Sequence, residues 1–169
     1  MWKYKGQTRP SFAIAPKPGQ ESVWDYPRPP QLMADHRRVV VRSDERQLAA
    51  TSTSFRLCET ASPPTFYLPA DCVDWDQLVP APGASRCEWK GDAQYWALKT
   101  QPGTPIAWSY ASPAQPYAAI KDHVAFYPAA VACFVDQVRV RPQAGRFYGG
   151  WITPELVGPF KGEPGTGHW

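Results

Sequence analysis

The sequence predicts a mainly β domain of short antiparallel strands, and three observations lead to this fold class. Proline is abundant, at 20 of 169 residues, and it interrupts long helices and central strands wherever it falls. Apolar and polar residues alternate over short segments such as 55–59, which is the period of a β-strand. Turn residues separate these segments, most clearly at 101–103, where the sequence is Gln-Pro-Gly.

The predicted elements follow one another in the order of the chain. Residues 37–42 include three consecutive valines and are expected to form a hairpin with 47–51 across a turn at 43–45. A second hairpin joins 93–99 to 106–110, which places neighbouring side chains on opposite faces. Further strands are expected at 55–59, 65–68, 124–127 and 138–141, a loop at 80–86, and short helices at 116–123 and 128–134.

The two ends of the chain are predicted to be straps that lie on a central domain of residues 24–141. Residues 1–23 form an extended arm, and residues 142–169 contain seven glycines. Disordered tails are poor in aromatic residues, whereas these two segments are rich in them. The aromatic residues concerned are Trp2, Tyr4, Phe147, Tyr148, Trp151, Phe160 and Trp169.

Composition and charge exclude several classes of protein. No run of 18 apolar residues is present, so we expect no membrane span. The first residues lack the apolar stretch of a signal peptide, which makes the cytosol the expected compartment. The formal charge of +3 is small and the basic residues are scattered, which argues against nucleic acid as a partner.

The cysteines and histidines do not have the spacing of a metal site. Cys58, Cys72, Cys87 and Cys133 form no Cys-x-x-Cys pair, and only three histidines accompany them, at positions 36, 123 and 168. A structural zinc site needs closely paired ligands, and disulfides are rare in a reducing compartment. We therefore expect free thiols, no metal and no cofactor.

A short pattern occurs three times: an aromatic residue, then lysine, then glycine. The copies are centred on Lys5, Lys90 and Lys161, which are three of the seven lysines of the chain. Glycine lets the backbone turn and lets other groups approach closely, while the lysine projects a compact positive charge beside the aromatic ring. The middle copy, Trp89-Lys90-Gly91, lies in the segment richest in candidate functional residues, 87–96, and we expect a functional site there.

Lys90, Glu59 and Arg56 are the candidate polar groups of that site. Lys90 can hold an anion or act as a general acid once it is partly desolvated. A structural ion pair of Glu59 with Lys90 or Arg56 is the alternative, and it has the better odds. Arg56 and Glu59 are three positions apart on a predicted strand, so they face opposite sides and pair with each other only if a bulge intervenes.

Cys87 and a set of aromatic residues complete the candidates. A cation at Lys90 favours the thiolate of Cys87, although a structural thiol is the more common role, and a base at His36 or His123 would have to lie close in space. The aromatic rings either form a core or line a pocket for a planar or cationic ligand, and strand alternation allows both. These rings belong to Tyr67, Trp89, Tyr95, Trp96, Trp108 and Tyr110, with Gly91 beside them.

Five segments carry a resemblance to a known family. They are Trp24 to Pro30, Arg56 to Thr60 with Pro63 to Tyr67, Cys87 to Gly91, Ala107 to Tyr110, and Val124 to Pro128. In order and spacing they resemble the domain of unknown function 427, also labelled as nucleotidyltransferase-like. The resemblance implies a β-tent type of fold, in which two antiparallel meanders lean together over a cleft. The phosphate-binding pattern Gly-x-x-x-x-Gly-Lys-Ser/Thr is missing here, so no motif supports the nucleotidyltransferase label.

The leading hypothesis is the binding of a small molecule or short peptide in an aromatic cleft, with Lys90, Arg56 and Glu59 as polar groups. A second hypothesis is an enzyme in which Lys90, Cys87 or Glu59 acts on that ligand, nucleotidyl transfer being one version. A third is a protein-interaction module that uses the aromatic terminal segments. A pocket that contains Lys90, Glu59 and an aromatic wall favours the first two, whereas a flat surface favours the third.

Overall fold

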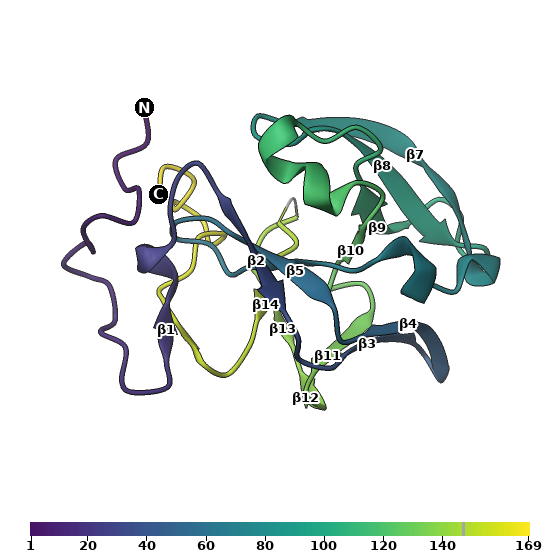
Figure 1. Cartoon of the computed structure of the whole chain (residues 1–169), viewed down its shortest axis with the longest axis horizontal. Helices are drawn as coiled ribbons and strands as arrows, with labels where there is room; N and C mark the ends of the chain where they lie inside the picture. Colours follow the sequence, from purple (N-terminus) through teal and green to yellow (C-terminus); the bar gives the residue numbers. More distant parts are fainter. Residues whose placement is uncertain (147) are drawn as a thin grey trace.

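The computed structural model describes residues 1–146 and 148–169 and confirms a mainly β protein with short helices. Within these residues the strands form several small sheets, nearly all of them antiparallel, and no sheet closes into a barrel. Figure 1 shows two of the sheets leaning toward each other at one end of the molecule, while the N- and C-termini lie near each other at the opposite end.

The first sheet is an antiparallel meander in which each strand pairs with the next along the chain (Figure 1). The hairpin predicted across residues 101–103 is confirmed, with Tyr95 opposite Trp108 and Trp96 opposite Ala107. The strands of this sheet are β7 (Leu78–Cys87), β8 (Gly91–Leu98), β9 (Pro105–Ser109) and β10 (Val124–Phe126).

The second sheet combines two hairpins that are far apart in the sequence. The hairpin predicted around residues 43–45 is confirmed as β3 and β4, and the later strand β11 pairs with β3 through Cys133 opposite Val41. This sheet has the order β12-β11-β3-β4. Its strands are β3 (Val39–Ser43), β4 (Arg46–Thr51), β11 (Ala132–Val135) and β12 (Val138–Arg139).

A third sheet, in the order β2-β5-β6, lies near the middle of the molecule (Figure 1). It consists of β2 (Gln31–Asp35), β5 (Ser54–Cys58) and β6 (Thr65–Tyr67). Four short 3-10 helices connect or cap the strands in the described residues. They are η1 (Val23–Asp25), η2 (Ala70–Cys72), η3 (Trp75–Gln77) and η4 (Gln115–Ile120).

Two local predictions were wrong. Residues 80–86 belong to strand β7 rather than to a loop, because an edge strand tolerates Pro80 and Pro82 and a bulge between Ala81 and Ser85 absorbs the irregularity. The helix expected at 128–134 is a single turn closed on the Tyr127 carbonyl, after which the chain becomes β11. In β11 every second side chain is buried, as in a strand that has one face on the core. In the sequence this segment is a short apolar run, which fits a buried strand and a buried helix equally well.

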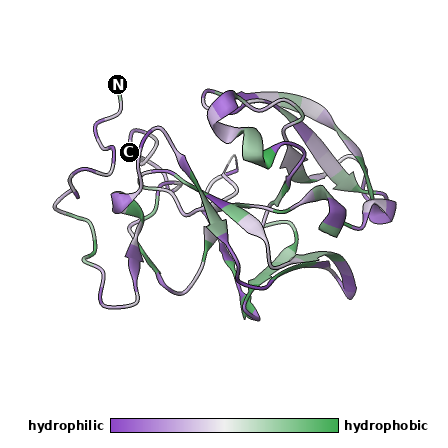
Figure 2. Cartoon of the chain, viewed as in Figure 1, coloured by the Kyte–Doolittle hydropathy of each residue, from purple (hydrophilic) through white to green (hydrophobic). Residues whose placement is uncertain are grey.

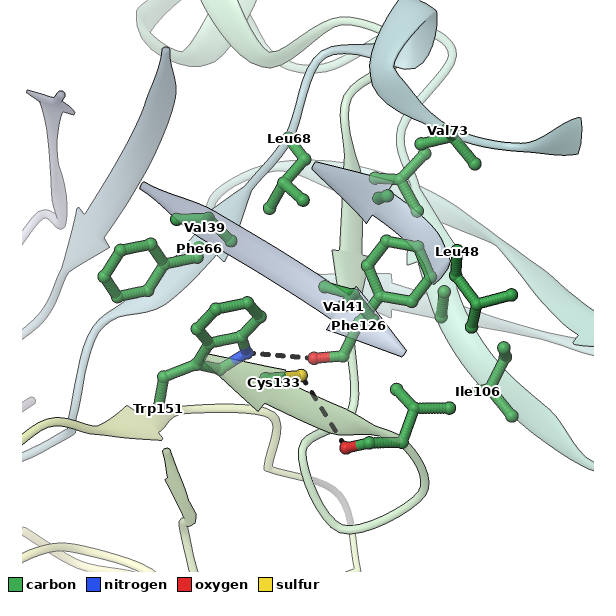
Figure 3. Packing of buried hydrophobic residues seen from close by; sticks show 14 of the residues in the cluster. Val39, Val41, Leu48, Phe66, Leu68, Val73, Ile106, Phe126, Cys133 and Trp151 are labelled. Atoms are coloured by element: carbon green, nitrogen blue, oxygen red, sulfur yellow. Dashed lines mark hydrogen bonds between the residues drawn. The ribbon is translucent and has the colours of Figure 1, made fainter. Parts of the chain in front are cut away.

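The main core lies between the first and second sheets (Figure 3). It is filled mostly by aliphatic side chains, together with Phe66, Phe126 and Trp151. Trp151 is fully buried, stacks on Phe66 with ring centroids 4.7 Å apart, and donates a hydrogen bond from Nε1 to the Phe126 carbonyl oxygen at 3.0 Å. Figure 2 shows the corresponding pattern along β3 and β11, where apolar residues concentrate away from the polar turns.

Both terminal segments make contacts with the rest of the protein. Strand β1 (Glu21–Ser22) pairs in parallel with β15 (Leu156–Val157), and β13 (Arg141–Pro142) pairs with β14 (Trp151–Ile152). Among the predicted strap aromatics, Phe147 lies outside the described residues. A cluster of rings joins the two ends of the chain, with adjacent centroids 5.2 to 6.3 Å apart. The cluster contains Tyr4, Phe12, Trp24 and Trp169.

All four cysteines are free thiols, and burial raises the pKa of Cys58 to about 12 and that of Cys72 to about 11. Within the described residues, no helix has the length and apolar character needed to cross a membrane.

Candidate functional site

Strands β6, β9 and β10 present one face to the main core and the other to a second cluster. In β6, Phe66 belongs to the core and Tyr67 to the second cluster. In β9, Ala107 belongs to the core and Trp108 to the second cluster, and in β10 Ala125 belongs to the second cluster. Successive side chains of a strand alternate between faces, so three short strands build both regions at once.

A cavity of about 270 Å³ lies within this second cluster, between β5 and β6 on one side and β8 and β9 on the other. The strap of residues 142–169 closes part of it through Gln143, Tyr148 and Gly149. Six of the nineteen residues that line it are aromatic, namely Tyr67, Tyr95, Trp108, Tyr110, Tyr127 and Tyr148.

The Tyr67 hydroxyl group is an unsatisfied polar group in this wall. Tyr67 is completely buried, and its hydroxyl has no hydrogen-bond partner among the described residues. A buried hydroxyl without a partner costs about 1–3 kcal/mol, so such groups in native proteins call for an explanation. Tyr67 lines the cavity, but its hydroxyl is covered by its surroundings, which include the rings of Trp108 and Tyr110, so a bound molecule would reach it only after a small shift of its neighbours.

Three tyrosines of the cavity are buried deeply enough to make their hydroxyl groups harder to ionise. Burial raises the pKa of Tyr67, Tyr110 and Tyr127 well above that of free tyrosine. Their hydroxyl groups therefore keep their protons and can both donate and accept hydrogen bonds. The side chain of Tyr95 is engaged differently, since its hydroxyl shares a hydrogen bond with Ser85 on the neighbouring strand.

Glu59 lines the cavity, but its negative charge is neutralised by Arg28, which lies outside the lining. The guanidinium of Arg28, itself buried, donates from Nε to Glu59 at 3.0 Å. Arg28 also donates to the carbonyl oxygen of Thr60 and to main-chain oxygens of Tyr4 and Trp169, which fixes the guanidinium in place. The Glu59–Arg28 pair, rather than a Glu59–Lys90 pair, holds this corner of the cavity.

Lys90 also lines the cavity, in the turn between β7 and β8. Its ammonium lies 5.6 Å from the centre of the Tyr110 ring, and it forms no ion pair among the described residues. The backbone is held by a hydrogen bond from the Ala114 amide to the Lys90 carbonyl at 3.0 Å. Gly91 follows with a φ of +106°, a left-handed conformation that glycine adopts without strain.

Lys161, from the C-terminal strap, lines the same cavity. Two of the three aromatic–Lys–Gly copies therefore meet there, although they are 71 positions apart, and in both the glycine has a positive φ. The ammonium of Lys161 is held by the main-chain oxygen of Trp169 at 3.2 Å and lies 4.2 Å from the Trp2 ring centre. Burial and the nearby Arg28 lower the pKa of Lys161.

The structure separates the other predicted site residues into two groups. Cys87 lines the cavity, whereas neither His36 nor His123 does. Trp89, in the same turn as Lys90, and Gly91, the first residue of β8, lie outside the cavity lining. The Trp89 indole nitrogen is buried without a partner among the described residues. Trp96 points away, into the main core, where its ring lies 4.7 Å from that of Trp75.

Arg56 lies outside the cavity, in a separate network of charges. Its Nη1 donates to Glu21 at 2.9 Å, and its Nε lies 3.2 Å from a carboxylate oxygen of Asp35. Arg37 joins Asp35 to Glu155 of the C-terminal strap, at 2.8 and 2.6 Å. These contacts tie the first and last segments of the chain to β2 and β5.

Several cavity residues did not stand out in the sequence. Tyr127 belongs to the family-like segment Val124 to Pro128 and Tyr148 to the C-terminal strap, but neither position indicated that the ring would line the same cavity as Lys90. Lys161 is part of the repeated aromatic–Lys–Gly pattern, but the sequence does not show that the fold places it in the same cavity as Lys90. Arg86, at the exposed edge of the cavity, pairs with Asp92 across the β7–β8 hairpin at 3.1 Å.

A metal site is not apparent in the part of the chain that the structure describes, where no group of three or more His, Cys, Asp or Glu side chains gathers. The cavity instead offers neutral hydroxyls, aromatic rings, one thiol and positively charged groups.

The comparisons with known proteins assign the chain to a family without assigning a function. No curated protein matches it. A family model described as a domain of unknown function, DUF427, and labelled NTP_transf_9 matches residues 31–137. This match includes Glu59, Tyr67, Lys90 and Trp108, but it excludes the strap that contributes Lys161. Because the match covers more than half of the 169 residues, the chain belongs to the DUF427 family.

Proposed function

We propose that this protein binds a small organic molecule in the cavity between β5, β6, β8 and β9. The observation that carries the proposal is a concave space of about 270 Å³ whose lining includes six aromatic residues and Lys90, an ammonium without an ion-pair partner among the described residues. Small-molecule sites are concave, mostly apolar or aromatic, and contain a few convergent polar groups. The concave shape, the aromatic part of the lining and the Lys90 ammonium support the proposal, although polar residues take a larger share of this lining than is usual.

The size of the cavity favours a small ligand over a peptide. Sites for drug-sized molecules have volumes of about 300–1,000 Å³. The volume here is about 270 Å³, which is enough for a molecule with one ring and one or two polar substituents. Rings on opposing strands, such as Tyr95 and Trp108, provide flat surfaces against which a planar ligand can stack.

A variant that fills the cavity tests this proposal. Ala93 is a buried residue of β8 that lines the cavity, and Ala84 is an exposed residue of the neighbouring strand β7 that does not. We expect the wild type and Ala84→Phe to bind at least one of four probes, namely phenol, benzamide, benzoate and benzylamine, in saturation-transfer NMR. Ala93→Phe should bind none, because the added ring occupies the ligand's place.

Thermal unfolding of both variants checks that the fold is retained, and Ala93→Leu replaces Ala93→Phe if the larger side chain prevents folding. The proposal fails if the wild type binds no probe, or if a folded cavity-filling variant binds the probes as well as the wild type does.

A further inference from the structure

The charged groups that line the cavity are not balanced. Glu59 is the only carboxylate in the lining described, and Arg28 neutralises it at 3.0 Å. Lys90, Lys161 and Arg86 are positively charged, and of these only Arg86 has an acidic partner within 4 Å in the described residues. That partner, Asp92, is as exposed as Arg86, so solvent screens the pair. The interior of the cavity therefore has an excess of positive charge.

Lys90 is the cation best placed to contact a ligand. Lys161 already donates to the Trp169 main-chain oxygen and lies against the Trp2 ring, so its ammonium is engaged by the strap. Lys90 donates no hydrogen bond to the described residues, and its ammonium lies beside the ring of Tyr110, which lines the cavity. Its half-buried side chain enters the cavity from a turn whose backbone is fixed by Ala114.

The hydroxyl groups in the walls complement this charge. Tyr110 and Tyr127 add no negative charge, since tyrosine is neutral at physiological pH and burial raises the pKa of both groups further. A protonated hydroxyl can donate to an anionic oxygen, and such hydrogen bonds are stronger than those between neutral groups. A cationic ligand would instead meet Lys90 and Lys161 in a partly desolvated space, where like charges repel strongly.

We propose that the ligand is a small aromatic acid, whose anionic group lies against Lys90 and the tyrosine hydroxyls while its ring stacks on the cavity walls. This inference rests on the proposed function and adds the chemical class of the ligand. A carboxylate and a phosphate share the chemistry that Lys90 recognises, so both belong to the class proposed.

A set of probes with the same ring and different charges tests the inference. Benzoate and phenyl phosphate are anions, benzamide is neutral and benzylamine is a cation. We expect the wild type to bind at least one of the two anions about tenfold or more tightly than benzamide, and benzylamine most weakly, as measured by NMR titration. A charged hydrogen bond contributes a factor of this size.

Variants of Lys90 identify the group responsible. Lys90→Met should remove the preference for the anion and leave the affinity for benzamide within about twofold, whereas Lys90→Arg should retain most of the preference. Lys99→Met is the matched control, because Lys99 is an exposed lysine at the end of the same hairpin strand and does not line the cavity. This control should bind all probes as the wild type does.

The possible results distinguish this inference from the proposed function. If benzamide binds as tightly as both anions, or if Lys90→Met keeps the preference, the anionic class is wrong although the cavity still binds small molecules. If none of these four probes binds, the inference fails, and if phenol does not bind either, the proposed function fails as well. A preference for benzoate over phenyl phosphate, or the reverse, supports the inference and identifies the anion.

Discussion

Strands β6, β9 and β10 separate a filled region of the molecule from a hollow one. On one face, Trp151 and its aliphatic neighbours fill the space between two sheets, and the indole nitrogen of Trp151 has a hydrogen-bond partner. On the other face, Tyr67 and Trp108 border a cavity of about 270 Å³, and the Tyr67 hydroxyl has no partner among the described residues. The same strands thus border a filled core with one face and a cavity with the other.

The difference between the faces lies in the kind of side chain as well as in the space between them. The main core is mostly aliphatic, and aliphatic side chains interdigitate closely. The second region contains large rings with hydroxyl groups at their ends, which leave gaps and carry polar atoms that need partners. The following predictions test whether the two faces differ in this way, beginning with the largest expected effect.

Truncating a tryptophan on each face compares their contributions to stability. Trp151→Ala should lower the free energy of unfolding by about 3–5 kcal/mol, because a fully buried ring is removed from a closely packed core. Trp108→Ala should cost less, since part of its ring already borders a cavity, but it should abolish binding of the aromatic probes. Urea unfolding measures both changes. A larger loss of stability for Trp108→Ala than for Trp151→Ala would contradict the distinction between the faces.

The contact between the strap and the cavity wall is tested by adding a methyl group. A Cβ at Gly149 would lie 2.2 Å from the ring of Trp108, so Gly149→Ala must displace the ring or the strap. We expect it to lower the free energy of unfolding by about 1–3 kcal/mol, the usual cost of overpacking, and to weaken probe binding. Gly103→Ala is the control, because a Cβ there meets no atom within 4 Å. Equal effects at the two positions would show that the strap is not closely docked.

Alkaline pH should destabilise the protein through the buried tyrosines, with a smaller effect. Their pKa values are raised in the folded state, so the unfolded chain loses these protons first, and the associated stability is present below about pH 10 and lost above it. Each such group contributes about 1.4 kcal/mol per pH unit in this range. Tyr110→Phe should therefore reduce the slope of unfolding free energy against pH above pH 10. An unchanged slope would mean that Tyr110 titrates normally in the folded protein.

Much of the fold could be predicted from local sequence. Turn residues at 43–45 and 101–103 located two hairpins, and alternation placed Tyr95 and Trp96 on opposite faces. The errors occurred where distant partners decide the structure. Strand β11 forms because β3 offers an edge to pair with, and β7 accepts its prolines because it lies at the edge of its sheet.

The candidate site was predictable to a similar extent. Glu59, Tyr67, Lys90 and Trp108 were selected from their motifs, and all line the cavity. Arg56 was grouped with them because it is near Glu59 in sequence, but its partners Glu21 and Asp35 come from other segments and hold it elsewhere. The strap adds Gln143, Tyr148, Gly149 and Lys161 to the cavity lining. No local sequence pattern shows that the chain returns to the cavity after residue 142.

Indole NMR signals test the central claim, that the hollow face binds an aromatic acid, most directly. The chain contains eight tryptophans, each with an indole N–H signal, and among them Trp108 lines the cavity while Trp151 lies in the filled core. During titration with benzoate, the signal of Trp108 should shift in a saturable manner, that of Trp151 should stay in place, and Lys90→Met should weaken the response. Shifts confined to other tryptophans, or no saturable shift at Trp108, would contradict the claim.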